Sequence, residues 1–233
     1  MKVRQLFDQD TWTYTYLLWD EDSKEAAIID SVKEQFERDS QYVRDLGLNL
    51  KYALETHVHA DHVTASGQFR NAFGVQVAVH EDGGTRCADI QIRDGMVFQL
   101  GNQEIKALHT PGHTNGDVSF AIEGAVFTGD ALLIRACGRT DFQQGDSATL
   151  YESIHQKLFS LSEETVVYPG HDYSGLTQSS IGEEKALNPR LGNNRSKAEF
   201  MEIMDTMNLP KPKRIDVAVP GNLVCGLTED KAA

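Results

Sequence analysis

Long apolar runs are missing from this 233-residue chain, which has nothing close to the roughly 18 consecutive apolar residues of a membrane-spanning helix. The N-terminal stretch "MKVRQLFDQDTW" lacks the apolar segment of a signal peptide and the Arg- and Ser-rich amphipathic pattern of a transit peptide. We therefore expect a cytoplasmic protein and no membrane partner.

A surplus of basic residues is also missing, since the net charge is −13. The one basic cluster, "PKPKR" at 210–214, is short and fits a solvated loop at least as well as a binding site. Binders of polyanions usually carry a basic surplus or stripe. Nucleic acid is therefore not an expected partner, and a nuclease is disfavoured.

Cysteines are few and have no paired or C-x-x-C spacing: Cys87, Cys137 and Cys225. This argues against a disulfide framework and against a zinc ribbon. We expect each cysteine to be a small buried hydrophobic residue. Cys137, in a Gly-rich loop, has the best claim to more, but we assign it no function.

The residue patterns that are present indicate one globular domain, residues 1–233, in which 175–233 form an integral helical and loop extension. Alternation and β-rich composition predict strands, and apolar spacing with possible caps predicts helices. The expected strands are 13–19, 26–30, 50–56, 75–80, several within 96–130, and 165–172. The expected helices are 33–46, 62–74, one capped by Asp146 or Ser147, 178–187 and 197–207. This order means mixed α and β structure and no more.

The stretch "HVHADH" places His57, His59, Asp61 and His62 within six positions. The whole chain has only 8 histidines, and packing offers no reason for such a cluster. Imidazole and carboxylate are the usual ligands of zinc, iron and manganese. The cluster therefore predicts a metal site.

Further polar residues follow other predicted strands: His113 in "HTPGHTNGD", Asp130 in "FTGD" and His171 in "YPGHD". Loops at strand ends let a rigid sheet aim such side chains at one point. Isolated histidines are more often structural. We therefore expect three histidines not to be ligands: His80, His109 and His155.

Taken in order, these motifs resemble the metallo-β-lactamase superfamily. The resemblance implies an α+β fold, the αβ/βα four-layer sandwich of two mixed β-sheets flanked by helices. In two-metal members of the superfamily the matching positions form two groups joined by a bridging Asp130. One group is His57, His59 and His113, and the other is Asp61, His62 and His171.

The stretches "CGRTDFQQGD" and "NPRL" resemble the persulfide dioxygenase branch, which is related to glyoxalase II. The resemblance runs from about Tyr14 to Cys225. It implies iron-dependent oxidation of glutathione persulfide by O2 and water to sulfite and glutathione. Glyoxalase II usually has a longer helical C-terminal domain than the 62 residues that follow His171 here.

In that branch one Fe(II) per chain is held by the positions of His57, His113 and Asp130. Two imidazoles and one carboxylate on one face leave open positions, as in non-haem Fe(II) oxygenases. Four further residues then form a supporting shell or a second metal position: His59, Asp61, His62 and His171.

Glutathione carries carboxylates, and an arginine guanidinium pairs with these in bidentate fashion. The candidates for substrate binding are Arg139, Arg190 and Tyr173. Each has a structural alternative; in particular, Arg139 could brace its loop by pairing with Asp141.

Two other functions are compatible with the sequence. The complete ligand set permits a binuclear zinc hydrolase of the glyoxalase II type acting on a glutathione thioester. A persulfide-binding module without turnover is disfavoured, because drift would have damaged at least one ligand. A homodimer and a functional link to a sulfurtransferase or a sulfide-oxidising enzyme fit the main interpretation.

Overall fold

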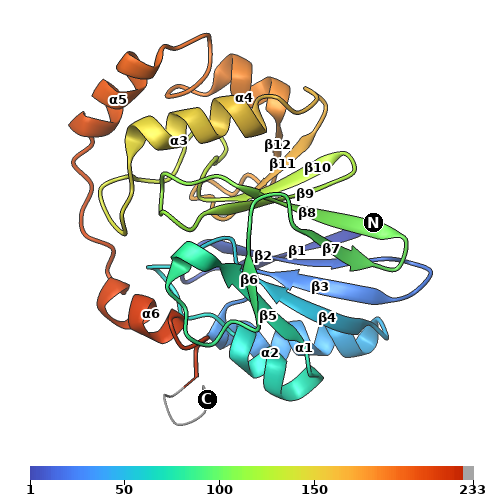
Figure 1. The fold of residues 1–233 in the computed structure, drawn as a ribbon. Coiled ribbons are helices and arrows are strands. Elements are labelled where there is room, and N and C mark those ends of the chain that lie inside the picture. The colour runs from blue at the N-terminus through green and yellow to red at the C-terminus, as the bar shows by residue number, and fades with distance from the viewer. Residues whose placement is uncertain (228–233) are drawn as a thin grey trace.

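The computed structural model describes residues 1–227, in which two six-stranded sheets pack face to face (Figure 1). Both sheets are mixed, because each contains parallel and antiparallel pairs. The first sheet contains β1 (Lys2–Asp8), β2 (Thr13–Trp19), β3 (Glu25–Ile29), β4 (Asn49–Leu54), β5 (Gln76–His80) and β6 (Ile90–Ile92). The second contains β7 (Val97–Leu100), β8 (Gln103–His109), β9 (Val118–Ile122), β10 (Ala125–Gly129), β11 (Val166–Pro169) and β12 (Ser179–Ser180).

Helices cover the outer faces of both sheets, so the four-layer sandwich is confirmed (Figure 1). On the first sheet lie α1 (Phe36–Asp45), α2 (Ser66–Phe73) and, at its edge, α6 (Ile215–Asn222). The short η1 (Lys33–Gln35) precedes α1, and η2 (Glu81–Gly83) follows β5. On the second sheet lie α3 (Ser147–Ser153), the π-helix η3 (Ile154–Leu158), α4 (Ile181–Leu187) and α5 (Lys197–Thr206).

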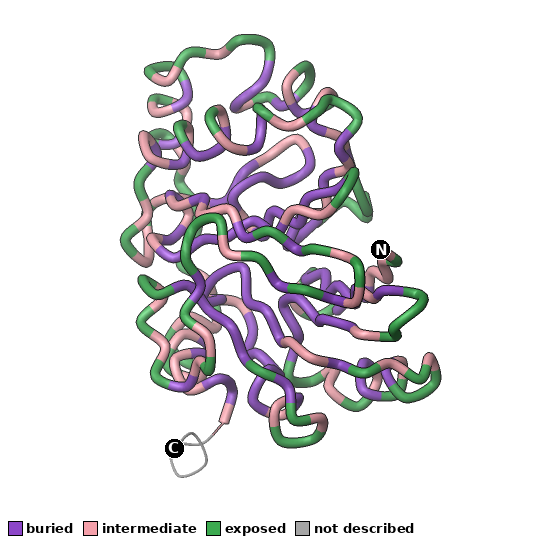
Figure 2. Tube along the Cα trace, turned by 45° about the vertical axis from the view of Figure 1, so that its right-hand side comes forward, coloured by how far each residue is buried: buried purple, intermediate pink, exposed green. Residues whose placement is uncertain are grey.

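Side chains of β2 alternate between its two faces and so pack both against the second sheet and against the helices. Tyr14, Tyr16 and Leu18 point into the apolar cluster between the two sheets. Leu17, on the opposite face of the strand, joins the cluster under α1 and α2. Figure 2 shows the buried residues concentrated in the strands and the exposed ones on turns and outer helix surfaces. Burial of both faces fixes the register of these strands, and therefore where their ends lie.

Several predicted elements differ in the structure. The helix expected over 62–74 begins only at Ser66, and the segment expected at 178–187 opens with the short strand β12. Asp146 is the N-cap of α3, which continues into η3. The strand β1 and the helix α6 were not predicted. Pro220 lies inside α6, and a proline normally argues against a helix interior.

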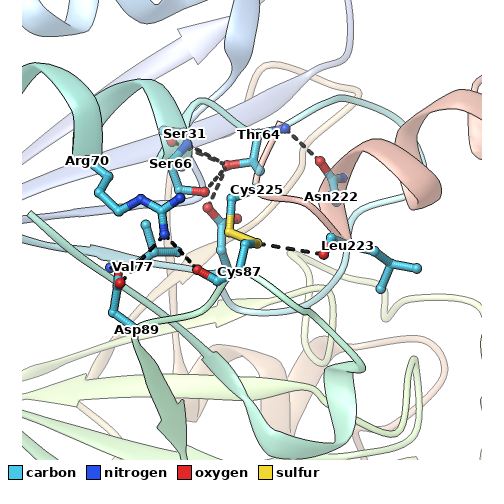
Figure 3. Close-up of a disulfide and its surroundings, with 11 residues drawn as sticks. Ser31, Thr64, Ser66, Arg70, Val77, Cys87, Asp89, Asn222, Leu223 and Cys225 are labelled. Carbon is cyan, nitrogen blue, oxygen red and sulfur yellow. Dashed lines mark hydrogen bonds and ion pairs between the residues drawn. A yellow bond between two sulfur atoms is a disulfide. The ribbon is translucent and has the colours of Figure 1, made fainter. Parts of the chain in front are cut away.

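The expectation that all three cysteines are simple buried hydrophobic residues is wrong for two of them. Cys87 and Cys225 form a disulfide across a sequence separation of 138 (Figure 3). Residues so far apart meet only through the tertiary fold, so no local spacing could have shown the pair. Cys137 is a free, buried thiol, as expected.

The C-terminal extension predicted over 175–233 contains β12, α4, α5 and α6. Its last six residues, 228–233, lie outside the described residues. Phe200 and Met204 of α5 pack in the same buried cluster as Leu150 of α3. Within residues 1–227, no helix is both long and apolar enough to cross a membrane.

Candidate metal centre

The predicted metal residues lie in loops that follow strands of both sheets. His57, His59, Asp61 and His62 follow β4, and the other three follow β8, β10 and β11. Gly129, at the end of β10, has φ +49, and a Cβ there would lie 2.5 Å from Thr56 Oγ1. Only a glycine therefore lets the turn before Asp130 approach the histidine loop this closely.

His57, His113 and Asp130 offer ligand atoms that all lie within 4.8 Å of one another. His113 Nε2 is 3.7 Å from Asp130 Oδ2. His113 Nδ1 donates to the carbonyl oxygen of Arg139 at 2.7 Å, so its lone pair is on Nε2. Two imidazoles and one carboxylate thus converge, as the resemblance implied.

The tautomer of His57 follows from its neighbours. The Thr56 hydroxyl donates to Asp30 Oδ2 at 2.7 Å, which uses its only proton. His57 Nδ1, 3.0 Å from the same hydroxyl, must therefore donate to it, and Nε2 keeps the lone pair. Burial lowers the pKa of His57 well below its usual value, and the charges of His59 and His113 lower it further. A neutral imidazole is the form that binds metal.

His171 lies between two carboxylates. Its Nδ1 is 2.7 Å from Asp130 Oδ1 and its Nε2 is 3.0 Å from Asp61 Oδ2. Burial lowers the pKa of His171, but the charges of Asp130 and Asp61 outweigh this and place it well above its usual value. Burial also raises the pKa of Asp130, but His171 and the other histidines outweigh this and leave it well below its usual value. His171 thus orients Asp130 as a carboxylate, with both of its own nitrogens engaged.

His59 faces buried acids. Its Nε2 is 3.1 Å from Asp30 Oδ1 and 3.5 Å from Glu55 Oε2. Burial lowers the pKa of His59, but Asp30 raises it more strongly, to well above its usual value. His62 Nδ1 is 2.9 Å from Asp61 Oδ2.

Two buried nitrogens test whether this site suits a metal. His59 Nδ1 and His62 Nε2 have no hydrogen-bond partner among residues 1–227. A buried polar atom without a partner is costly, and it requires an explanation such as an ion or water. With Asp61 these two histidines form a second group whose ligand atoms lie within 4.8 Å of one another. The residues present therefore fit metal binding, and their number would accommodate a second ion.

The histidines expected not to be ligands lie elsewhere. His80 and His109 stack with ring centroids 3.9 Å apart, and with Asp82 they are close enough to share an ion. Because the two rings are nearly parallel, their nitrogen lone pairs point in similar directions and do not converge on one ion. His109 Nε2 also already contacts the Asn115 carbonyl. His155 stacks on Tyr151. That none of the three is a ligand stays a prediction.

In the structure Arg139 braces its own loop by pairing with Asp141. Its guanidinium pairs with both carboxylate oxygens of Asp141, at 2.6 and 2.8 Å, and donates to the Pro210 carbonyl at 2.7 Å. It also lies over the Phe142 ring, 4.5 Å from the centroid. The loop braced in this way supplies the Arg139 carbonyl that orients His113.

The other two substrate candidates differ in exposure. Tyr173 is 67% exposed, and its ring is parallel to that of His171 at 6.1 Å between centroids. Arg190 donates to the Cys137 carbonyl at 2.8 Å, which ties the "NPRL" segment to the loop after Asp130.

Sequence reasoning missed several residues that support the site. Thr13 Oγ1 lies 3.1 Å from both Asp61 Oδ2 and His171 Nε2. Asp30 ends the run "AAIID", so the strand-end rule that found Asp130 could also have found it. Nothing in the sequence near Thr13 indicates its role.

Comparison with known proteins identifies the family. Residues 13–171 match the metallo-beta-lactamase superfamily. The mitochondrial persulfide dioxygenase ETHE1 of Bos taurus is 50% identical over 228 residues, which cover 97% of this chain and 89% of the relative. The chain belongs to the persulfide dioxygenase family.

Other persulfide dioxygenase and hydrolase relatives agree with the resemblance. The crystal structure of ETHE1 from Myxococcus xanthus superposes with a TM-score of 0.95 at 49% identity, covering 97% of this chain and 100% of the other. The hydroxyacylglutathione hydrolase GloC of Haemophilus influenzae is 37% identical, over a match that covers 75% of this chain and 91% of GloC. The predicted branch, its fold and its relation to glyoxalase II are therefore confirmed.

Proposed function

We propose that this persulfide dioxygenase oxidises glutathione persulfide with O2 and water to glutathione and sulfite, using one Fe(II) per chain. The observation that carries the proposal is the convergence of His57, His113 and Asp130, in a chain 50% identical to a named persulfide dioxygenase. That identity over 97% of the chain favours oxidation over the hydrolytic alternative, because the hydrolase GloC shares only 37% identity.

His57, His113 and Asp130 would hold the iron through the two Nε2 atoms and the carboxylate. Bound there, Fe(II) would supply open coordination positions for O2 and the persulfide sulfur, together with the redox chemistry.

Neighbouring groups of the chain orient these three ligands. Thr56 and the Arg139 carbonyl set the tautomers of the two imidazoles. His171 keeps the Asp130 carboxylate ionised and oriented. We propose that His59, Asp61, His62 and His171 act as this supporting shell and not as ligands to a second ion. Both nitrogens of His171 face carboxylates, which supports that role.

We further propose that Tyr173, Arg139 and Arg190 serve the glutathione moiety, Tyr173 through its exposed hydroxyl. For Arg139 the pairing with Asp141 means that a substrate carboxylate would compete with an internal partner. Arg139→Ala should raise KM for glutathione persulfide strongly with unchanged iron content. An unchanged KM would leave Arg139 with the bracing role alone.

The reaction is tested by loading the protein anaerobically with Fe(II), adding glutathione persulfide in an oxygen electrode and measuring sulfite. We expect one O2 consumed per sulfite formed. The matched control is the Zn(II)-loaded protein, which should consume none. Absence of O2 uptake with Fe(II), together with thioester cleavage by the Zn(II) form, would favour the hydrolase.

The cytoplasmic location, a homodimer, a link to a sulfurtransferase or sulfide-oxidising enzyme, and the integral single domain over 1–233 are also proposals. The bovine relative is described as mitochondrial. The packing of α5 against α3 supports the single domain. Analytical ultracentrifugation at micromolar concentration decides between monomer and dimer.

A further inference from the structure

We propose that Asn222, the last residue of α6, is a positioning residue for the metal centre. Its side chain fixes the backbone of the loop from His59 to Thr64 and, through it, the contacts that orient Asp130. The inference rests on the proposed metal site, but not on the reaction carried out there.

Asn222 is 4% exposed, and its amide is fully engaged with the histidine loop. Its Nδ2 donates to the carbonyl oxygens of His59 and His62, both at 2.9 Å. Its Oδ1 accepts from the Thr64 backbone N–H at 2.8 Å. The reverse orientation of the amide would set an oxygen against two carbonyl oxygens, so the assignment of nitrogen and oxygen is unambiguous. One side chain thus satisfies three backbone groups that the loop itself leaves unpaired.

The loop that Asn222 holds is connected by two hydrogen-bonded contacts to Asp130, a proposed iron ligand. Asp61 lies between the two carbonyls that Asn222 holds, and its Oδ2 is 3.0 Å from His171 Nε2. His171 Nδ1 in turn is 2.7 Å from Asp130 Oδ1. His57 and Asn222 also line the same small cavity, of about 10 Å³. Displacing the loop would therefore move Asp61 and remove the support of Asp130.

Asn222 has its own anchors, which distinguish it from a polar residue that merely ends a helix. Three positions later Cys225 forms the disulfide to Cys87, and its carbonyl accepts from Gly67 N at 2.9 Å. Lys33 Nζ donates to the Gly226 carbonyl at 2.8 Å. Figure 3 shows the Asn222 amide pointing at Thr64 beside this disulfide. The segment is thus tied to η1, to α2 and to the loop after η2, which makes it a rigid brace.

The test compares metal binding in variants whose melting temperatures are also measured. Asn222→Ala removes all three contacts, while Asn222→Ser is milder and serves if the alanine variant does not fold. The control is Phe98→Leu, which loosens the buried cluster between the two sheets; that cluster contains none of the seven polar residues or their chain neighbours. Each protein is titrated anaerobically with Co(II), and the dissociation constant, the Co(II) absorption bands and the melting temperature are recorded.

We expect Asn222→Ala to bind Co(II) about 10- to 100-fold more weakly, with altered absorption bands, which is the usual effect of losing a group that orients ligands. Phe98→Leu should keep the parent affinity and spectrum at a similar loss of melting temperature. Binding within twofold of the parent in Asn222→Ala and Asn222→Ser, or equal weakening in Phe98→Leu, would overturn the assignment. The Co(II) comparison is independent of turnover, so it stands even if the Fe(II) protein consumes no O2.

Discussion

His57 and His59 are two positions apart and have opposite electrostatic surroundings. His57 donates to a hydroxyl and lies beside other histidines, so its pKa is driven down by burial and by their charges. Burial also lowers the pKa of His59, but Asp30 outweighs this and the pKa rises. The first imidazole is therefore suited to ligate a metal, whereas the second faces the carboxylates of Asp30 and Glu55.

Replacing single carboxylates separates the two roles. In Asp61→Asn we expect one Fe(II) per chain to be retained and kcat to fall about 10- to 100-fold, since His171 loses a charged partner. In Asp130→Asn the iron itself should be lost. Metal analysis after gel filtration and O2 uptake measure both effects. A parent protein that holds two ions and an Asp61→Asn variant that holds one would contradict the single-iron proposal.

Cys137 should be unreactive in the folded protein. Burial raises the pKa of its thiol to about 11, so at pH 8 only about one molecule in a thousand would carry a thiolate. Thiol titration with a chromogenic disulfide should find none in the native protein, one after unfolding without reductant, and three after unfolding with reductant. Three thiols without reductant would show that the disulfide does not form in solution.

At the scale of elements, capping residues in the sequence predicted some helix termini correctly. Two elements of unusual composition, α6 and β1, were not predicted. Asp146 caps α3 and Gly74 ends α2 with a left-handed φ of 71, as the residue types suggested. The helix α6 was not predicted because Pro220 lies within it, and β1 was not predicted because four of its seven residues are polar. Packing of Val219 against the apolar cluster under α1 and α2 outweighs the low helix propensity of Pro220.

The cap of α3 gives a pH-dependent test. Hydrogen bonds from Thr149 lower the pKa of Asp146 below its model-compound value of 3.8. The folded pKa is depressed, so the cap contributes stability above pH 3.8 and loses it as the pH falls through the folded pKa. Asp146→Ala should cost about 1 kcal/mol at pH 7, whereas Asp146→Asn should cost only a few tenths because asparagine also caps.

Urea unfolding from pH 7 to pH 2.5 measures this dependence. As the pH falls, the free energy of unfolding of the parent should decrease relative to that of Asp146→Asn, because asparagine keeps its capping oxygen without titrating. A difference that does not change with pH would show that the Asp146 carboxylate does not act as the cap in solution.

At the scale of the whole molecule, the Cys87–Cys225 disulfide closes most of the chain into one loop. The cross-link spans 138 positions and joins the segment after η2 to the end of α6. Closing a loop of this length restricts the unfolded chain, and disulfides typically contribute about 2–5 kcal/mol to stability. It also holds the segment that carries Asn222 against the first sheet.

Removing the disulfide should lower the free energy of unfolding by about 2–5 kcal/mol in Cys87→Ser/Cys225→Ser. Dithiothreitol should shift the urea midpoint of the parent towards that of the variant. The variant itself is the control, because reductant should leave its midpoint unchanged. A parent midpoint that does not respond to complete reduction would show that the cross-link does not contribute to stability.

The sequence alone was enough to predict the seven polar residues at the strand ends, because short motifs encode them. The resemblance of those motifs to a known family then implied the fold and the persulfide dioxygenase branch. The mutual arrangement of those residues was decided only by tertiary structure. Thr13 and His171 are separated by 158 positions, Asn222 and His59 by 163, and Cys87 and Cys225 by 138. Local spacing carries no information about contacts at such separations. These contacts form because two sheets buried on both faces hold their strand ends at one edge, where the histidine loop and the end of α6 meet.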